Sequence, residues 1–449
     1  MSTAEPSRKI PQVGFLRFLR HASNIVKNPL PFHNANFKRL GSTFVLKIGL
    51  KSEVIFSKDA EFLRYTLQKN QRNYTKSKIQ TRDLAKYVGR GLLTAEGAHW
   101  QRQRKLIQPA FHKKQLYNLL HTMQHVIAGE LKNIKDGSAA DVHPVFSDLA
   151  FQTVVKTLFS GGVSEEQIDY LQKATEEAQQ MMVKELRQPF LVWWFWGSGM
   201  IKKHLKAVKE ARQMLKNLVN ERRESGQRFD DLLDMLLDAR YEDGSAMDEE
   251  QLIDEILILF VAGHETTSNA LSFTCELLAR HPKELEKVQQ EARRLTNTED
   301  LMEVLKEATF IKQVVKESMR LYPPAYFIDR VNYKEDHFKD YTIRQDSTIL
   351  FSVYEIHRSE DYWDDPLRFD PDRFDPQKPR QHSDYYFPFG AGPRMCIGNN
   401  FAVYEMVLAL VHLFGNYSLE TKNTPIAINP LITLKPKDAI LVFHKLNGD

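Results

Sequence analysis

The sequence is poor in cysteine and has no long apolar run. Cys275 and Cys396 are the only cysteines among 449 residues, which excludes a framework of disulfide bonds. No stretch approaches the roughly 18 to 20 successive apolar residues that a bilayer-spanning helix requires. The first 20 residues carry several charges and lack the apolar core of a secretory signal, so we expect a cytoplasmic protein without a transmembrane segment.

The chain also has no strong excess of charge and no recognisable linker. Its 62 Lys and Arg stand against 58 Asp and Glu, a net charge of +4, which gives no reason to expect a nucleic-acid partner. Linkers rich in Gly, Ser or Pro, fixed-period repeats and low-complexity segments are missing. We therefore expect one large domain over residues 1–449, with residues 1–39 as an N-terminal lead.

What is present is mainly helical periodicity. It runs from about residue 96 to 320 and is interrupted at Pro109, Pro144, Pro189 and Pro282, where a helix must stop or bend. Short β signals occur at residues 44–48 and 54–56, with Gly49 available for a turn. Residues 431–434 and 440–443 predict a hairpin around 435–438. The predicted fold class is mainly α with small β-sheets.

Residues 250–280 predict one unusually long helix. Apolar side chains between Leu252 and Val261 cover all of its sides, and a helix that is apolar all round is buried. About 30 residues at 1.5 Å each would extend for roughly 45 Å. The helix should end just before Pro282. We expect it to be the long central helix of the domain.

The middle of this helix, residues 262–268, is poor helix material. Gly263 costs about 1 kcal/mol relative to alanine, and a buried carboxylate such as that of Glu265 is unfavourable without a partner. Such local conflicts concentrate at functional sites, so we expect a small-molecule pocket, with Gly263 allowing a large flat group to approach the backbone. Alternatively, His264 and Glu265 are satisfied polar groups at a helix contact. A zinc HExxH site is excluded because the second histidine position is Ser268.

A second unusual segment is the glycine-rich loop over residues 387–398, which contains Cys396 and directly precedes a predicted helix. Unpaired N–H groups at a helix start favour a thiolate, and Arg394 adds positive charge two residues away. A dinucleotide-binding fingerprint is excluded because its third glycine would fall at Met395. Cys275 lies on the buried helix and is interpreted as a core residue. Cys396 is therefore the candidate metal ligand.

Together the two segments resemble the haem-ligand loop and the oxygen-activation helix of the cytochrome P450 superfamily, in particular soluble bacterial carotenoid and fatty-acid hydroxylases. The resemblance implies the P450 fold, with haem b (iron protoporphyrin IX) bound and Cys396 as the iron ligand. It also implies a structural lock formed by Glu317, Arg320 and Arg373. The expected cofactor-binding residues are Trp100, Arg104, Arg330, Phe389, Arg394, Cys396 and Gly398.

The resemblance further implies a monooxygenase in which Glu265 and Thr266 deliver protons to the oxygen side. We expect a lipophilic substrate (a carotenoid, terpenoid or fatty acid) in a pocket lined by Phe260, Ala262, Tyr326 and Phe327. Two other functions stay open: a haem-thiolate isomerase or dehydratase, and a non-catalytic haem-binding protein. Glu265 and Thr266 argue against both, since neither function needs an acid and a hydroxyl at that place.

The chain ends about 50 residues after the cysteine loop, so we expect no fused reductase. Electrons from NAD(P)H would then arrive through a separate ferredoxin or flavodoxin. A basic face that could attract such an acidic carrier comprises Arg102, Arg104, Lys105, His112, Lys113 and Lys114. Residues 190–196 hold three of the five tryptophans and predict either core packing or contact with a membrane surface.

Overall fold

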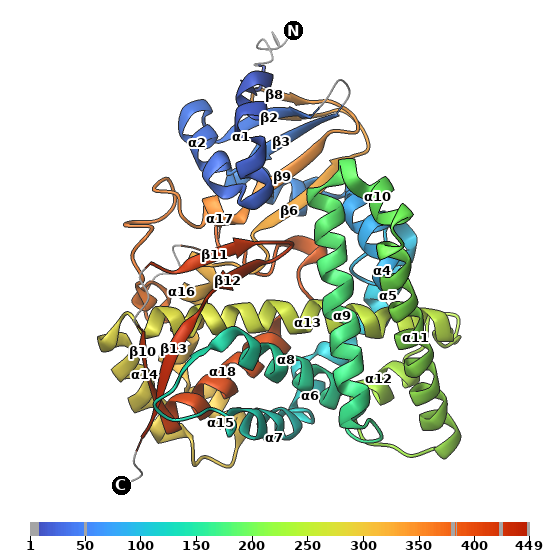
Figure 1. Ribbon diagram of the computed structural model, residues 1–449, viewed down its shortest axis with the longest axis vertical. Helices are drawn as coiled ribbons and strands as arrows, with labels where there is room; N and C mark the ends of the chain where they lie inside the picture. Colours follow the sequence, from blue (N-terminus) through green and yellow to red (C-terminus); the bar gives the residue numbers. More distant parts are fainter. Residues whose placement is uncertain (1–8, 49–51, 379–381, 383, 422–424, 447–449) are drawn as a thin grey trace.

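The computed structural model describes residues 9–48, 52–378, 382, 384–421 and 425–446. Helices dominate it (Figure 1), and their bounds follow in chain order. They are α1 (Phe15–Lys27), α2 (Leu30–Leu40), α3 (Ala60–Arg64), α4 (Ala85–Val88), α5 (Gly97–Ile107), α6 (Lys113–Tyr117), α7 (Leu120–Leu131), α8 (Val142–Phe159), α9 (Glu165–Arg187), α10 (Val192–Gly197), α11 (Met200–Ser225), α12 (Leu232–Asp238), α13 (Glu249–Leu278), α14 (Pro282–Leu295), α15 (Leu301–Glu307), α16 (Thr309–Leu321), α17 (Val353–Ile356) and α18 (Asn399–Asn416).

The strands form four small sheets among the described residues. The largest has the order β1-β2-β3-β9-β6-β4, and the others are β10-β13-β5, β11-β12 and β7-β8. The bounds are β1 (Gln12–Val13), β2 (Thr43–Ile48), β3 (Ser52–Ser57), β4 (Tyr74–Thr75), β5 (Ala139–Asp141), β6 (Phe327–Asn332), β7 (Asp336–Phe338), β8 (Tyr341–Ile343), β9 (Thr348–Ser352), β10 (Tyr417–Thr421), β11 (Ala427–Pro430), β12 (Leu434–Lys437) and β13 (Ile440–Lys445). The prediction of a mainly α domain with small sheets is confirmed.

Helix α13 crosses the middle of the molecule (Figure 1). It begins after Asp248, whose carboxylate accepts a hydrogen bond from the backbone N–H of Gln251 (2.8 Å). It ends at Leu278, and Pro282 then opens α14 at the position where its missing N–H costs nothing. The helix packs most extensively against α8 and also against α16 and α18. The predicted long central helix is therefore confirmed, and α8, α16 and α18 pack against it.

The predicted hairpin around residues 435–438 is wrong. Leu434–Lys437 (β12) pairs with β11, whereas Ile440–Lys445 (β13) pairs with β10 and β5 in another sheet. The two strands serve different clusters: Leu434 packs with Leu30, Phe273 and Tyr326, while the apolar residues of β13 join the main core. The apolar residues placed the second strand correctly, but the first strand covers residues 434–437, most of the expected turn, and 431–433 are not in a strand.

Residues 44–48 and 54–56 lie in strands β2 and β3, which pair antiparallel. The turn expected at Gly49 lies outside the described residues. Within the N-terminal segment, β1 adds to this sheet beside β2. Val13, Phe32 and Phe37 pack there in one apolar cluster with residues of β2 and β3. Within the described residues, no helix is long and apolar enough to cross a membrane.

Candidate functional site

The cysteine loop is a tightly bonded turn in front of α18. The N–H of Cys396 donates to the carbonyl of Phe389 (2.9 Å), and that of Met395 donates to the carbonyl of Gly392 (3.0 Å). Gly392 has a φ of +70°, and a Cβ there would lie 2.0 Å from the Leu67 carbonyl oxygen. Only glycine fits such a position. The loop therefore holds the Cys396 side chain in a fixed place three residues before α18 starts.

Cys396 is exposed on one side, although protein atoms surround most of its thiol. Burial raises the pKa of the thiol, while a hydrogen bond from the Gly398 N–H and the charge of Arg104 lower it. The expectation that Arg394 supplies this charge is wrong, since Arg394 is paired elsewhere. Cys275 is fully buried, and burial raises the pKa of its thiol strongly, as expected for a core cysteine. Of the two thiols, only that of Cys396 is open to a ligand.

The central helix α13 is also exposed to solvent at one residue. Between Gln251 and Leu278, Ala262 is the one exposed residue, whereas Phe260 and His264 beside it are buried. Glu265 and Thr266 lie next to this opening and are half-buried. The Thr266 hydroxyl donates to the Ala262 carbonyl (2.7 Å). This hydrogen bond leaves the lone pairs of the hydroxyl oxygen free to accept another.

Gly263 serves helix packing and not the approach of a flat group. A Cβ on this residue would lie 2.9 Å from Cγ2 of Val154 on α8. The glycine therefore allows α13 and α8 to pack closely. The predicted role of Gly263 in exposing the backbone to a cofactor is wrong, because periodicity alone does not show which neighbour a small residue faces.

His264 and Glu265 have different surroundings. His264 Nε2 lies 2.8 Å from the Ser147 hydroxyl, and its ring contacts Phe151 edge-on at 5.4 Å between centroids. Burial lowers the pKa of His264 to about 3, so this imidazole is neutral at ordinary pH. His264 therefore matches the interpretation as a polar group at a helix contact, with Nε2 paired and Nδ1 without a hydrogen-bond partner among the described residues.

Glu265 is held by a chain of hydrogen bonds that the sequence did not reveal. Burial raises the pKa of Glu265, while a hydrogen bond from Thr433 and the charge of Lys435 lower it. The Thr433 hydroxyl accepts from Nδ2 of Asn269 (2.9 Å), and Oδ1 of Asn269 lies 3.0 Å from Nε2 of His143. With one lone pair used by Asn269, the Thr433 O–H is directed to the Glu265 carboxylate. The chain therefore fixes where this carboxylate sits.

A surplus of buried positive charge lies between β6, α5 and the cysteine loop. Arg394 forms two hydrogen bonds to Glu96 (2.5 and 2.6 Å), and its guanidinium lies 4.6 Å from the Trp100 ring centroid. Arg330 is buried, and within the described part of the chain it forms no ion pair. Burial and the charge of Arg394 lower the pKa of Arg330 to about 10. A bound anion would remove this imbalance.

Lys76 belongs to the same cluster and was missed by the sequence analysis. Its Nζ donates to the carbonyls of Leu92 and Ala95 (2.9 Å each). Burial, followed by the charges of Arg394 and Arg330, lowers the pKa of Lys76 to about 7, although Glu96 opposes this shift. Lys76, Arg330 and Arg394 lie close together, with the carboxylates of Glu96 and Asp329 also nearby, and such a group of cationic donors suits an anionic ligand.

Arg104 has a different role from the one expected. Its Nη1 donates to the carbonyl of Met395 (2.8 Å) and its Nε to Gln108 (3.0 Å). Arg104 therefore braces the residue before Cys396. The remaining members of the predicted cofactor site, Phe389 and Gly398, lie within the cysteine loop and provide the backbone contacts to Cys396 described above.

Glu317, Arg320 and Arg373 come together as the sequence indicated. Arg320 and Glu317 form a doubly bonded pair (2.7 and 2.8 Å), and both side chains are fully buried. Arg373 Nε lies 3.5 Å from Oε1 of Glu317. Arg320 also donates to the carbonyls of His357, Pro366 and Arg368. The three residues join α16 to the segment that leads to the cysteine loop.

Two of the four predicted pocket residues, Phe260 and Tyr326, are buried, and Phe327 is half-buried. Phe260 is fully buried and packs on Phe151, with 5.5 Å between ring centroids. Tyr326 is buried and donates its hydroxyl to the Leu431 carbonyl (2.6 Å). Phe327 packs on Tyr326 and His33. Phe260 as a pocket residue is therefore wrong, and only Ala262 is open in the expected way.

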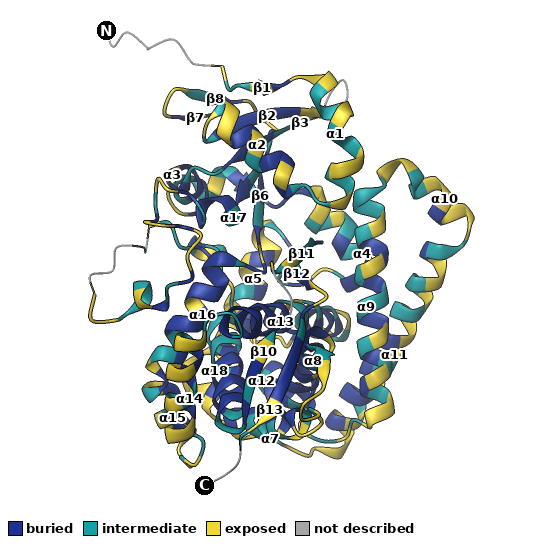
Figure 2. Ribbon diagram, turned by 60° about the vertical axis from the view of Figure 1, so that its left-hand side comes forward, coloured by how far each residue is buried: buried dark blue, intermediate teal, exposed yellow. Residues whose placement is uncertain are grey.

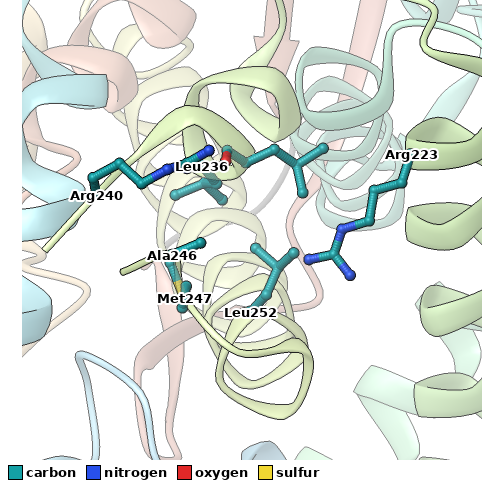
Figure 3. A pocket seen from close by; sticks show the side chains of 7 residues that line it. Arg223, Leu236, Arg240, Ala246, Met247 and Leu252 are labelled. Carbon is teal, nitrogen blue, oxygen red and sulfur yellow. Dashed lines mark hydrogen bonds between the residues drawn. The ribbon is translucent and has the colours of Figure 1, made fainter. Parts of the chain in front are cut away.

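A separate hollow of about 250 Å³ lies near the start of α13 (Figure 3). None of the predicted site residues lines it. Its lining consists of Arg223, Leu236, Leu237, Arg240, Ala246, Met247 and Leu252. No acid, thiol or imidazole faces it, so it offers no catalytic group.

Two of the six residues of the predicted basic face are paired with acids: Arg102 with Asp243 (2.8 Å) and Lys105 with Glu242. His112, Lys113 and Lys114 are exposed. The tryptophan-rich segment is the opposite of a core element: Trp193 is 72% exposed, and of residues 190–196 only Phe195 is buried. The core-packing interpretation of this segment is wrong.

These observations fit a haem group. The open sides of Cys396 and Ala262 interrupt an otherwise packed interior, as expected where a flat ligand belongs. Lys76, Arg330 and Arg394 with Trp100 offer donors to two carboxylates, which haem carries as propionates. Cys396 offers one thiolate to the iron.

Replacing Lys76 with methionine is expected to weaken haem binding about tenfold to hundredfold, because hydrogen bonds with a charged partner contribute about 1.5–3 kcal/mol. A propionate would restore the ammonium form of a lysine whose pKa is lowered to about 7. Above pH 7, Lys76 would therefore take up a proton when haem binds. The affinity of the unmodified protein for haem should consequently fall as pH rises from 7 towards 10.5.

Titration of the apoprotein with haem at several pH values tests this. The exposed neighbour Lys78→Met is the matched control and should bind haem as the unmodified protein does. An unchanged affinity of Lys76→Met, or a pH dependence that survives this substitution, would contradict the assignment.

Comparison with known proteins gives the family. The cytochrome P450 family model matches residues 5–443. Cytochrome P450 CYP72A613 of Trigonella foenum-graecum is 29% identical over 84% of this chain and 76% of its own length. Pentalenene oxygenase of Streptomyces avermitilis is 27% identical over 96% of this chain and 94% of its own. The structure of retinoic acid-bound cyanobacterial CYP120A1 superposes with a TM-score of 0.82 at 25% identity, covering 95% of this chain and 96% of that one.

The family match over nearly the whole chain agrees with the cysteine loop, the exposed Ala262 on the central helix and the buried cations described above. The chain belongs to the cytochrome P450 family and is a haem-dependent monooxygenase.

Proposed function

We propose that this monooxygenase inserts one oxygen atom of dioxygen into a lipophilic substrate, a carotenoid, terpenoid or fatty acid. Electrons from NAD(P)H would arrive through a separate ferredoxin or flavodoxin. The observation that carries the substrate class is the opening at Ala262. A small apolar side chain is exposed there on an otherwise buried helix, one turn before Thr266. An apolar side chain at Ala262, next to the polar residues Glu265 and Thr266, favours a hydrocarbon-rich molecule.

The named ligands of two similar proteins support this class. Pentalenene oxygenase acts on pentalenene, and the CYP120A1 structure holds retinoic acid. Both compounds are rich in hydrocarbon. Neither identifies the substrate of this chain, but both agree with an apolar site beside Ala262.

In the mechanism that we propose, bound haem supplies the iron chemistry that activates dioxygen, and Cys396 holds the iron. Trp100, Arg330 and Arg394, with Lys76, would hold the propionates. Arg104 braces the loop through the Met395 carbonyl. These residues place the cofactor and take no part in moving protons.

Protons would pass along the open edge of α13. The Thr266 hydroxyl donates to the Ala262 carbonyl and so presents its lone pairs to a water molecule. The Glu265 carboxyl, whose pKa is raised by burial, would hold the next proton. The hydrogen bonds that link Thr433, Asn269 and His143 would keep this carboxyl in place.

Thr266→Ala is expected to retain haem and to divert most of the reducing equivalents to hydrogen peroxide, with an order-of-magnitude loss of product per NAD(P)H, because ordered proton delivery contributes about 10²–10⁴-fold. Peroxide and product are measured together against NAD(P)H consumed.

Thr274→Ala is a matched control, since Thr274 makes the same hydrogen bond to the carbonyl four residues earlier but lies in the buried part of α13. It should stay coupled. Tight coupling in Thr266→Ala would remove Thr266 from the mechanism.

The substrate class is tested by spectral titration of the haem-loaded protein with fatty acids, carotenoids and terpenes. Binding should shift the haem spectrum for at least one of these groups, and Ala262→Phe should abolish the shift by filling the opening. Lipophilic compounds that all fail to shift the spectrum, while a polar compound succeeds, would overturn the proposal. Turnover with a surrogate ferredoxin or flavodoxin then identifies the electron partner.

A further inference from the structure

The hollow near the start of α13 combines buried apolar side chains with exposed cations. Leu236, Met247 and Leu252 line it and are buried. Arg223 and Arg240 also line it but are exposed, and Figure 3 shows their side chains reaching towards it from opposite sides. Helix α11, which carries Arg223, lies at the edge of the molecule with exposed residues along its length (Figure 2). A molecule from solvent can therefore reach the hollow past the two arginines.

Arg223 has no acidic partner. It forms no ion pair and no hydrogen bond with another residue that the structure describes. Glu221 and Glu224 are close in sequence, but residues one or two positions apart on a helix do not face each other. The positions that do share its side of the helix carry no charge, and these are residues 219, 220, 226 and 227. The Arg223 guanidinium is therefore available to a ligand.

Arg240 is bonded to carbonyl groups instead of a carboxylate. Its Nη1 donates to the carbonyls of Leu237 and Ala239 (2.6 and 2.9 Å), at the C-terminal end of α12. The hydrogen bond from Arg228 lowers the pKa of Asp238, and the charge of Arg240 adds to this effect, so Asp238 is near. Both carboxylate oxygens of Asp238 accept from Arg228, however. Arg240 therefore keeps N–H donors for another acceptor.

Other acids of this region are already paired with other cations. They lie on α12, in the turn over residues 241–245 and in the first turn of α13. The pairs are Asp234–Arg222, Asp238–Arg228, Glu242–Lys105, Asp243–Arg102, Glu249–Lys216 and Glu250–Arg212. Two arginines without a carboxylate partner thus line one small hollow. An anion bound there would meet both guanidinium groups.

The size and place of the hollow narrow the choice of anion. Its volume of about 250 Å³ equals that of roughly eight water molecules at about 30 Å³ each, and a methylene group takes a similar volume. Leu252 precedes Ala262 by ten residues on α13, which is roughly 15 Å along a helix. The hollow therefore suits a carboxylic acid of about eight carbons, away from the opening at Ala262.

We propose that this hollow binds a medium-chain carboxylate at a site separate from that of the substrate. The carboxylate would lie between Arg223 and Arg240, and the hydrocarbon chain would cover Leu236, Met247 and Leu252. Guanidinium groups bind carboxylates through paired N–H donors. A sulfate ion would satisfy the arginines but leave the apolar side chains uncovered, and a neutral alcohol would do the reverse. The bound acid would link α11 to α12 and α13.

The test is isothermal titration calorimetry of octanoate into the haem-loaded protein at low salt. Phenylimidazole is first bound to the haem iron, so that the opening at Ala262 is filled. Octanoate should bind with a dissociation constant of about 1 mM or lower. Octanol and inorganic sulfate should bind at least about tenfold more weakly, because each satisfies only half of the site. Equal binding of octanol, stronger binding of sulfate, or no binding of octanoate would overturn the proposal.

Two variants test the residues of the hollow. Arg223→Gln should weaken octanoate binding at least about tenfold by removing a charged hydrogen-bond donor, and Ala246→Phe should do so by filling the hollow. Arg293→Gln is the matched control, since Arg293 is also an exposed arginine on a helix with no ion pair among the described residues. It should bind octanoate normally.

Undiminished binding in Arg223→Gln, or loss of binding in Arg293→Gln, would contradict the assignment. Without octanoate, titration of Arg223→Gln with lipophilic substrates should shift the haem spectrum as in the unmodified protein. A failure of this site is therefore distinct from a failure of the proposed function. A changed substrate titration in Arg223→Gln would contradict a separate site.

Discussion

Glu317→Ala is expected to destabilise the protein by about 3–5 kcal/mol, because it leaves the buried Arg320 without its carboxylate. The Arg320 guanidinium is fully buried and cannot turn to solvent. Its hydrogen bonds to three carbonyls hold the segment before the cysteine loop. A domain is typically stable by only about 5–15 kcal/mol, so this loss should also reduce the yield of haem-loaded protein.

Urea unfolding followed by circular dichroism measures this effect. The matched control is Glu307→Ala, which breaks an exposed pair with Arg294 at 4.0 Å and should change stability by less than about 1 kcal/mol. A loss below about 1 kcal/mol in Glu317→Ala would mean that the buried pair does not act as a lock.

Cys396→Ser is expected to reduce turnover to background while leaving the apoprotein folded. The loop is held by backbone hydrogen bonds, such as that from the Cys396 N–H to Phe389, and these do not depend on sulfur. A serine hydroxyl is a weak ligand that does not push electron density onto iron as a thiolate does. Haem affinity should fall as well.

Cys275→Ala is the control for this substitution. It removes a buried thiol and should cost no more than a small cavity in the core, about 1 kcal/mol, with turnover retained. Turnover by Cys396→Ser comparable to that of the unmodified protein would contradict the assignment of the iron ligand.

The features that the sequence predicted well are local. The apolar residues of the central helix and the glycines before Cys396 act within a few residues, so their effect on structure follows from spacing. The same holds for Glu317 and Arg320, one helical turn apart on α16. Residues that meet only after folding were missed. Lys76 joins Arg330 and Arg394, and Thr433 reaches Glu265, across long stretches of chain.

The errors have a related cause. Phe260 was expected in the pocket together with Ala262, but two residues apart on a helix these side chains point to different sides. Strand β12 was paired with the wrong neighbour because alternating side chains do not specify which sheet a strand joins. Sequence spacing gives a face or a strand, whereas the partner on that face depends on the fold.

The most direct test of the central claim is the ferrous carbon monoxide difference spectrum of the purified protein and its two cysteine variants. Thiolate ligation by Cys396 predicts the strongly red-shifted band in the unmodified protein and in Cys275→Ala, and its absence in Cys396→Ser. A red-shifted band that persists in Cys396→Ser, or that disappears in Cys275→Ala, would contradict the assignment of Cys396 as the iron ligand.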